Sequence, residues 1–186
     1  SRQAQRAGQI IHRIRAFVKR SEPQRQPAYA HNIVEDAVDL AGIELRRRNV
    51  SIRTYVAQRL PEVLAIECHF GLGNMQVNIE PARFERAVIN LLNNASEALV
   101  GKGDDPKSQY CGNPTIQVST RLSGRGVDIT VTDNGPGISP ENLSKIREPL
   151  FTTKNFGTGL GIPAVEQILE QHGGGRDIAS HEGKGA

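Results

Sequence analysis

The segment that most constrains the fold is residues 81–99, "PARFERAVINLLNNASEAL". Pro81 suits the first position of a helix, and the apolar residues that follow recur at steps of three and four. These residues are Phe84, Ala87, Val88, Leu91, Leu92, Ala95, Ala98 and Leu99. The spacing predicts a long helix with one continuous buried face.

The rest of the chain shows helical and strand patterns that do not alternate regularly. We expect an amphipathic helix over 33–45, a strand "VSIRTYV", possible strands "EVLAIECHF" and "MQVNIE", a hairpin of "TIQVSTRL" and "VDITVTD", a short helix over 141–146, a helix from near Leu160 and a final strand "RDIAS". This order predicts the α+β class, with helices layered on one face of a mixed, largely antiparallel sheet.

The N-terminal residues carry an apolar seam on a basic background. The seam consists of Ala7, Ile10, Ile11, Ile14, Phe17 and Val18. A seam of this kind needs a partner, so we expect residues 1–22 to belong to a helical hairpin or coiled coil. The alternative is a helix packed on its own domain. Pro23 and Pro27 favour a linker over 23–30, which leaves 31–186 as the main domain.

Composition narrows the possible functions. The 186 residues suffice for one domain with a smaller attached element, and the formal charge of +3 is too small to indicate a nucleic-acid partner. The two cysteines, Cys68 and Cys111, form no CxxC pair, which favours a reducing compartment. No run of eighteen apolar residues occurs, so we expect a cytoplasmic portion whose membrane segments, if the parent protein has them, lie elsewhere.

Glycines at positions 157, 159 and 161 precede the last predicted helix, in "KNFGTGLGIPAVEQIL". A dinucleotide fingerprint requires a buried strand before its glycines, but "FTTKNF" is polar and turn-like. A P-loop is excluded, because no glycine is followed by Lys and Ser or Thr at the required spacing. Two interpretations stay open: an anion held by the helix N-terminus, or a turn without a ligand.

Two polar features interrupt otherwise apolar elements. Asn90 and Asn94 are four residues apart and therefore share one face of the 81–99 helix. Asp133 ends a predicted strand, and Gly135 and Gly137 after it permit a sharp turn that leaves the carboxylate at a pocket wall. Taken one at a time, each feature also fits an ordinary role, namely amides satisfied by backbone or solvent and a turn with no ligand.

Four motifs in order make a specific signal. The segments "NLLNNASEA", "DNGPGI", "EPLFTTK" and "GTGLGI" resemble the asparagine, first glycine, phenylalanine and second glycine boxes of the catalytic domain of sensor histidine kinases. The segment "RAGQIIHRIRAFVKR" resembles the end of the second dimerisation helix in kinases of the nitrogen- and oxygen-responsive type. The segment "EQHGGGRDIASHEGKGA" resembles their C-terminal part without its last strand.

The resemblance implies a two-layer α/β sandwich of the Bergerat type, which binds ATP and Mg²⁺. Asp133 would accept a hydrogen bond from the adenine amine, and Asn94 would bind the metal with help from Asn90. Lys154 would neutralise phosphate charge during transfer. Gly157, Gly159 and Gly161 would wrap the phosphates as a short lid, which Phe151 and Phe156 would anchor. The implied site residues are Asn90, Asn94, Asp133, Gly135, Gly137, Ile138, Lys154, Gly157, Thr158, Gly159, Leu160 and Gly161.

The implied reaction is transfer of the ATP γ-phosphoryl group to a histidine and then to an aspartate of a response regulator. Same-fold ATPases place a glutamate where this chain has Asn90, and an amide cannot act as a base, so transfer is favoured over hydrolysis. The family's acceptor histidine lies on the first dimerisation helix, whereas His12 falls on the apparent second helix and the other four histidines follow it. We therefore expect the acceptor to lie outside this chain, and a homodimer to form through the N-terminal helix. The alternatives are a hydrolysing ATPase and a non-catalytic nucleotide-binding or dimerisation module.

Overall fold

The computed structural model describes residue 8 and residues 22–56, 76–100, 113–123, 126–154 and 157–186. Its elements in chain order are β1 (Gln26–Tyr29), α2 (Ala30–Arg47), β2 (Ser51–Val56), β3 (Gln76–Ile79), α3 (Pro81–Val100), β4 (Thr115–Ser123), β5 (Gly126–Asp133), α4 (Pro140–Lys145) and α5 (Gly161–Gln171). The expected strand "EVLAIECHF" lies outside these ranges. So does the expected dimerisation helix, except for residues 8 and 22.

The strands form two sheets within the described residues. β1 pairs antiparallel with β3, and the second sheet has the order β2-β4-β5. In that sheet β2 runs parallel to β4, whereas β4 and β5 form the predicted antiparallel hairpin. The expected α+β class with a mixed, largely antiparallel sheet is confirmed.

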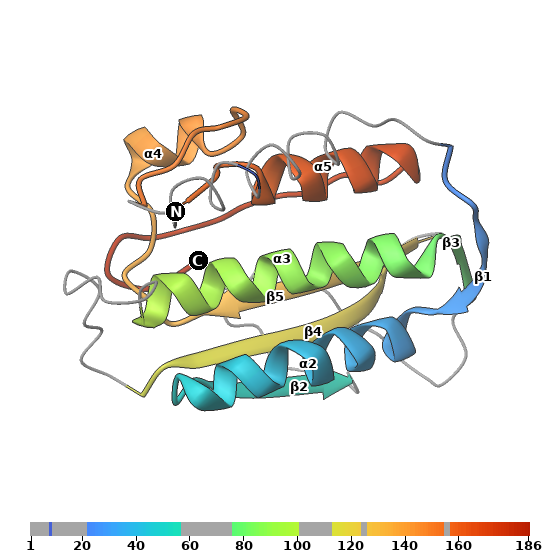
Figure 1. The fold of residues 1–186 in the computed structure, drawn as a ribbon, viewed down its shortest axis with the longest axis horizontal. Helices are drawn as coiled ribbons and strands as arrows, with labels where there is room; N and C mark the ends of the chain where they lie inside the picture. The colour runs from blue at the N-terminus through green and yellow to red at the C-terminus, as the bar shows by residue number, and fades with distance from the viewer. Residues whose placement is uncertain (1–7, 9–21, 57–75, 101–112, 124–125, 155–156) are drawn as a thin grey trace.

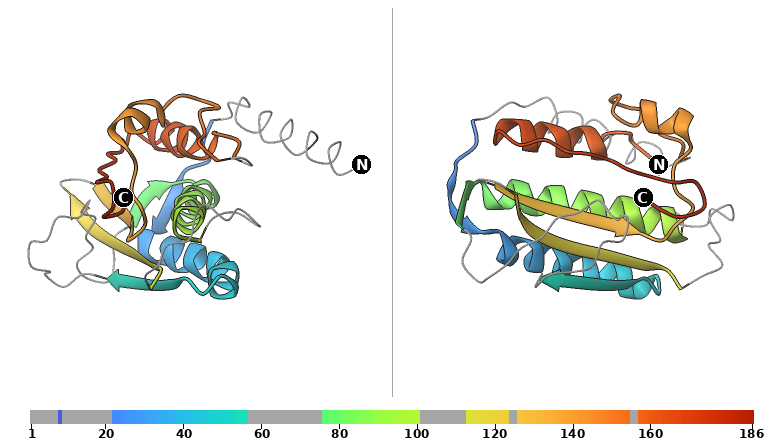
Figure 2. Two further views of the ribbon diagram at one scale, coloured as in Figure 1. Left: turned by 90° about the vertical axis from the view of Figure 1, so that its left-hand side faces the viewer. Right: turned by 180° about the vertical axis from the view of Figure 1, so that it is seen from behind.

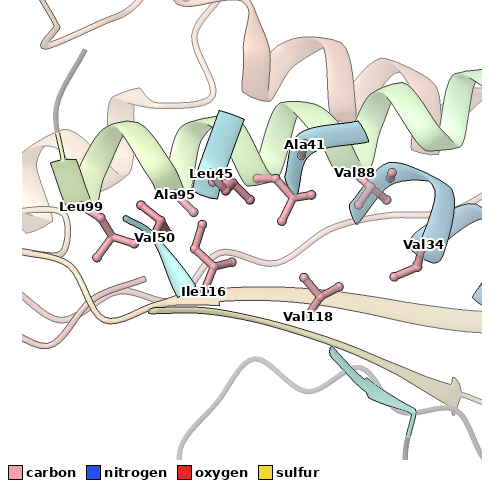
Figure 3. Close-up of a cluster of buried hydrophobic side chains, with 11 residues drawn as sticks. Val34, Ala41, Leu45, Val50, Val88, Ala95, Leu99, Ile116 and Val118 are labelled. Atoms are coloured by element: carbon pink, nitrogen blue, oxygen red, sulfur yellow. The ribbon is translucent and has the colours of Figure 1, made fainter. Parts of the chain in front are cut away.

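Helices α2 and α3 cover the same side of the three-stranded sheet (Figures 1 and 2). The main core lies between these two helices and the sheet (Figure 3), and comprises Val34, Ala37, Ala41, Leu45, Val50, Val88, Leu92, Ala95, Leu99, Ile116 and Val118. Leu92 on α3 and Ile116 on β4 have no exposed surface. The buried side chains of α3, which recur every three or four residues, therefore pack in one layer with those of β4, which recur every two residues.

Helix α5 packs on a different strip of α3. Ala87 of α3 and the α5 residues Val165 and Ile168 form a second buried cluster, with Phe84 and Leu91 against it. The wide apolar face predicted for residues 81–99 thus serves two layers, with α2 and the sheet on one strip and α5 on another. As a result α3 sits centrally in the domain (Figure 1).

Two expectations about local structure are wrong. Residues 23–30, expected to be a linker, contain β1, and α2 already begins at Ala30. β1 has only four residues, QPAY, without an alternating pattern, so it is not recognisable without its partner β3. The segment "RDIAS" (176–180), expected to be the final strand, pairs with no strand among the described residues. The β-bridge that follows it joins His181 to Gly185.

Candidate functional site

The carboxylate of Asp133 lies at the end of β5 in the three-stranded sheet. Its register partner is Ile116, and the residue is only 8% exposed. The turn after it is fixed by Asn134, whose Oδ1 accepts from the Thr115 N–H at 2.8 Å and whose Nδ2 donates to the Asn113 carbonyl at 3.0 Å. These hydrogen bonds to the start of β4 therefore fix the backbone at the end of β5, next to Asp133.

Burial raises the pKa of the Asp133 carboxyl above its ordinary value, because desolvation disfavours the charged form. Three weaker influences oppose this rise: backbone hydrogen bonds from Gly135 and Ala186 and the positive charge of Lys154. The Gly135 N–H donates to Asp133 Oδ1 at 2.9 Å. A carboxylate has room for several donors, so this buried acceptor is suited to a ligand N–H group as well.

Gly135 and Gly137, the two glycines after Asp133, leave no room for a side chain. A Cβ on Gly135 would lie 2.7 Å from Asp133 Oδ1, so any side chain there would crowd the carboxylate. Gly137 has φ +75°, and a Cβ on it would lie 2.2 Å from the His181 carbonyl oxygen. The next residue, Ile138, donates its N–H to Ser180 Oγ at 2.8 Å. The C-terminal turn therefore covers the second half of this glycine motif.

Asn90 and Asn94 lie one turn apart on α3, and both are half-buried. The N-terminus of α5 faces Asn94, because a Cβ on Gly161 would lie 3.3 Å from Asn94 Nδ2 and 3.5 Å from its Oδ1. This close approach favours a glycine at position 161. The tertiary structure thus brings the predicted metal-binding amide next to the last glycine of the predicted lid.

The lid, defined as the described residues 150–154 and 157–161, has a backbone hydrogen bond at its base. The Leu150 N–H donates to the Gly159 carbonyl at 3.0 Å. Gly159 has φ +62°, and a Cβ on it would lie 2.3 Å from the Leu150 carbonyl carbon. Leu150 itself has φ +70° and is 60% exposed. Of the two expected anchors, Phe151 is half-buried, whereas Phe156 lies outside the described residues.

Lys154 reaches from the lid to α3. Its Nζ donates to Glu97 Oε2 at 2.8 Å, across 57 positions of sequence. The Glu97 side chain is 16% exposed and that of Lys154 is 34% exposed. Sequence reasoning missed Glu97. The available signal was its spacing, since Glu97 lies three residues after Asn94 and therefore on the same face of α3.

The first turn of α5 completes the arrangement. Leu160, the residue that precedes α5, is buried, and Pro163 lies in the first turn. The unsatisfied N–H groups of such a terminus favour negative charge. No group of three or more His, Cys, Asp or Glu side chains within the described ranges could hold a metal ion.

Comparisons with known proteins identify the family of the chain. Residues 79–186 match the family described as histidine kinase-, DNA gyrase B-, and HSP90-like ATPase. The chain belongs to this family. Its ATP-binding domain is of the sensor histidine kinase type, since the whole chain is 31% identical over 186 residues to sensor histidine kinase ZraS of Escherichia coli (strain K12). The chain spans about a third of that relative's length, 35%.

Solved structures show the same fold. The catalytic domain of histidine kinase ThkA has a TM-score of 0.61 at 23% identity, over 80% of this chain and 82% of that one. A structure of ThkA in complex with the response regulator protein TrrA has a TM-score of 0.70 at 21% identity, over 99% of this chain and 46% of that one. Among the described residues, no helix combines the length and apolar composition of a membrane span.

Proposed function

We propose that this chain binds ATP with Mg²⁺ and donates the γ-phosphoryl group to a histidine of a sensor kinase, from which a response regulator aspartate receives it. The observation that carries the proposal is that Lys154 contacts Glu97 of α3 and its charge acts on Asp133, while Asn94 of α3 faces Gly161. The family of ATPases and the kinase relatives support ATP as the nucleotide. One structural neighbour, the kinase ThkA, forms a complex with a response regulator, which supports that class of partner.

Each residue has a role that its surroundings suit. Asp133 accepts a hydrogen bond from the exocyclic amine of adenine, a group that guanine lacks at that position. Asn134 fixes the backbone next to this carboxylate. The glycines of the lid and the first turn of α5 surround the phosphates, with Gly157, Thr158, Gly159, Leu160 and Gly161 contributing backbone groups.

The residues present fit Mg²⁺, which prefers oxygen ligands and usually binds proteins through one or two groups while keeping water and phosphate oxygens. Asn94 would supply an amide oxygen, and Asn90 would support it from the preceding turn. When bound, the ion would neutralise phosphate charge. Asn90 has no basic group with which to activate water, so this position favours transfer over hydrolysis.

Nucleotide binding tests the site directly. Asp133→Asn should abolish the preference for ATP over GTP, because the amide presents a donor as well as an acceptor. Asp128→Asn is the matched control, since Asp128 lies on the same strand and contacts Arg121 at 3.9 Å. Unchanged ATP preference in the Asp133 variant would refute the adenine assignment.

The metal assignment has its own pair of variants. Asn94→Ala should weaken Mg²⁺-dependent ATP binding by about tenfold or more, a loss of about 1.4 kcal/mol. Asn93→Ala is the control, because Asn93 is the exposed neighbour on the same helix. An equal loss in both variants would show a general effect on α3 and would contradict a metal role for Asn94.

The acceptor is tested with a protein that contains both dimerisation helices. Radiolabel from γ-labelled ATP should appear on a histidine of that protein in the presence of this chain. Steady phosphate release without a labelled side chain would instead indicate a hydrolysing ATPase. Dimer formation through residues 1–22 belongs to the same proposal, and the oligomeric state of the chain with and without these residues tests it.

A further inference from the structure

Helix α3 presents a further polar side chain, Glu97, beside Asn90 and Asn94. Asn90, Asn94 and Glu97 are spaced by four and then three residues, so they line one strip of the helix. Asn94 faces Gly161 at the start of α5, and Glu97 contacts Lys154 of the lid. A carboxylate therefore lies one turn from the amide proposed to bind the metal, in a place where phosphates would be repelled by negative charge.

Lys154 neutralises that carboxylate in the structure. Its ammonium lies 2.8 Å from Glu97 Oε2, and the glutamate side chain is mostly buried. An ion pair with limited access to solvent is stronger than an exposed one, because screening by water is weaker. Lys154 is also the lid residue proposed to contact phosphate, so Glu97 and the γ-phosphate would compete for the same ammonium group.

We infer that Glu97 is the resting partner of Lys154 and that the γ-phosphate of ATP takes the lysine from it. The inference rests on the proposed function and adds a residue that determines the preference for ATP over ADP. With ADP no γ-phosphate reaches the lysine, and the Lys154–Glu97 pair stays closed. With ATP the ammonium moves to the phosphate, so part of the binding free energy is used to break the ion pair.

Replacing the carboxylate removes this competition. Glu97→Gln keeps the shape of the side chain but not its charge, so Lys154 becomes available to phosphate. We expect ATP to bind about three- to tenfold more tightly and ADP to change by less than about twofold, in line with coupling energies measured for contacting residues. Glu141→Gln is the matched control, because Glu141 forms a Lys–Glu pair of the same 2.8 Å length with Lys145 on α4. That variant should leave both affinities unchanged.

A second background separates release of the lysine from simple repulsion. In Lys154→Met protein there is no lysine to release, so the gain from Glu97→Gln should shrink. The experiment measures ATP and ADP dissociation constants with Mg²⁺ for wild type, both single variants and the double variant. An equal or larger gain in the Met background would overturn the inference, because Glu97 would then act on the phosphates directly.

The remaining outcomes are also decisive. If wild type binds ATP but Glu97→Gln leaves the ATP-to-ADP preference unchanged, the role of Glu97 fails and the proposed function stands. If wild type binds neither nucleotide with Mg²⁺, the proposed function and this inference fail together. A raised ATP preference that depends on Lys154 supports both.

Discussion

Two glycines that both have a positive φ differ in their surroundings, and this pair tests the geometry of the lid. Gly159 has φ +62° and Gly173 has φ +74°. An alanine in the left-handed region costs about 1–2 kcal/mol, partly offset by about 0.4–1 kcal/mol from the smaller freedom of the unfolded chain. A Cβ on Gly173 would have no atom within 4 Å, so for Gly173→Ala we expect only this net loss of about 0–1.6 kcal/mol.

Gly159→Ala meets an additional obstacle. Its Cβ would lie 2.3 Å from the Leu150 carbonyl carbon and 2.5 Å from the Phe151 oxygen, too close to backbone that no rotamer change can move. The base of the lid must therefore open, which breaks the 3.0 Å hydrogen bond from Leu150 to Gly159 at a cost of about 1 kcal/mol. The core between α2, α3 and the sheet is not involved, so the damage should stay in the lid.

The assay compares stability and nucleotide affinity in both variants. Urea unfolding should give free energies that differ by about 1 kcal/mol, the value of the broken hydrogen bond. Calorimetric titration with ATP and Mg²⁺ should show at least about a tenfold weaker affinity for Gly159→Ala only, whereas the Gly173 variant should bind within about twofold of wild type. Wild-type affinity in Gly159→Ala, or an equal loss in Gly173→Ala, would refute the close approach as the reason for the glycine.

Two further predictions concern stability. Burial raises the pKa of the Asp133 carboxyl, so the folded state binds that proton more tightly than the unfolded state. The destabilisation is therefore full at pH above the raised pKa, shrinks as pH falls through it and disappears below the pKa of the unfolded state. Asp133→Asn without nucleotide should raise the melting temperature at neutral pH and lose this advantage in acid, and a gain that persists unchanged in acid would contradict the burial argument. Leu92→Ala should lower the free energy of unfolding by about 2–5 kcal/mol in urea titrations, since Leu92 has no exposed surface, whereas Leu40→Ala on the exposed face of α2 should change it by about 0.5 kcal/mol or less; similar losses in both would contradict the location of the core.

The local patterns of the sequence predicted the elements that enclose the site. The apolar period after Pro81 predicted α3, and the alternation around Gly126 predicted the β4–β5 hairpin. The placement of Asn90 and Asn94 on one helix face also followed from spacing alone. These features depend on residues close in sequence, so neighbouring side chains and backbone preferences are enough to indicate them.

Contacts between distant segments were decided only by the tertiary structure. β1 is recognisable only through its pairing with β3, and the segment "RDIAS" has alternation without a partner among the described residues. The ion pair of Glu97 with Lys154 spans 57 positions and leaves no local pattern in either motif. The sequence by itself determined the long helix α3, the β4–β5 hairpin and the common helix face of Asn90 and Asn94, because those properties are periodic. Which of these residues meet across the domain depends on how the layers pack, and no periodicity encodes that.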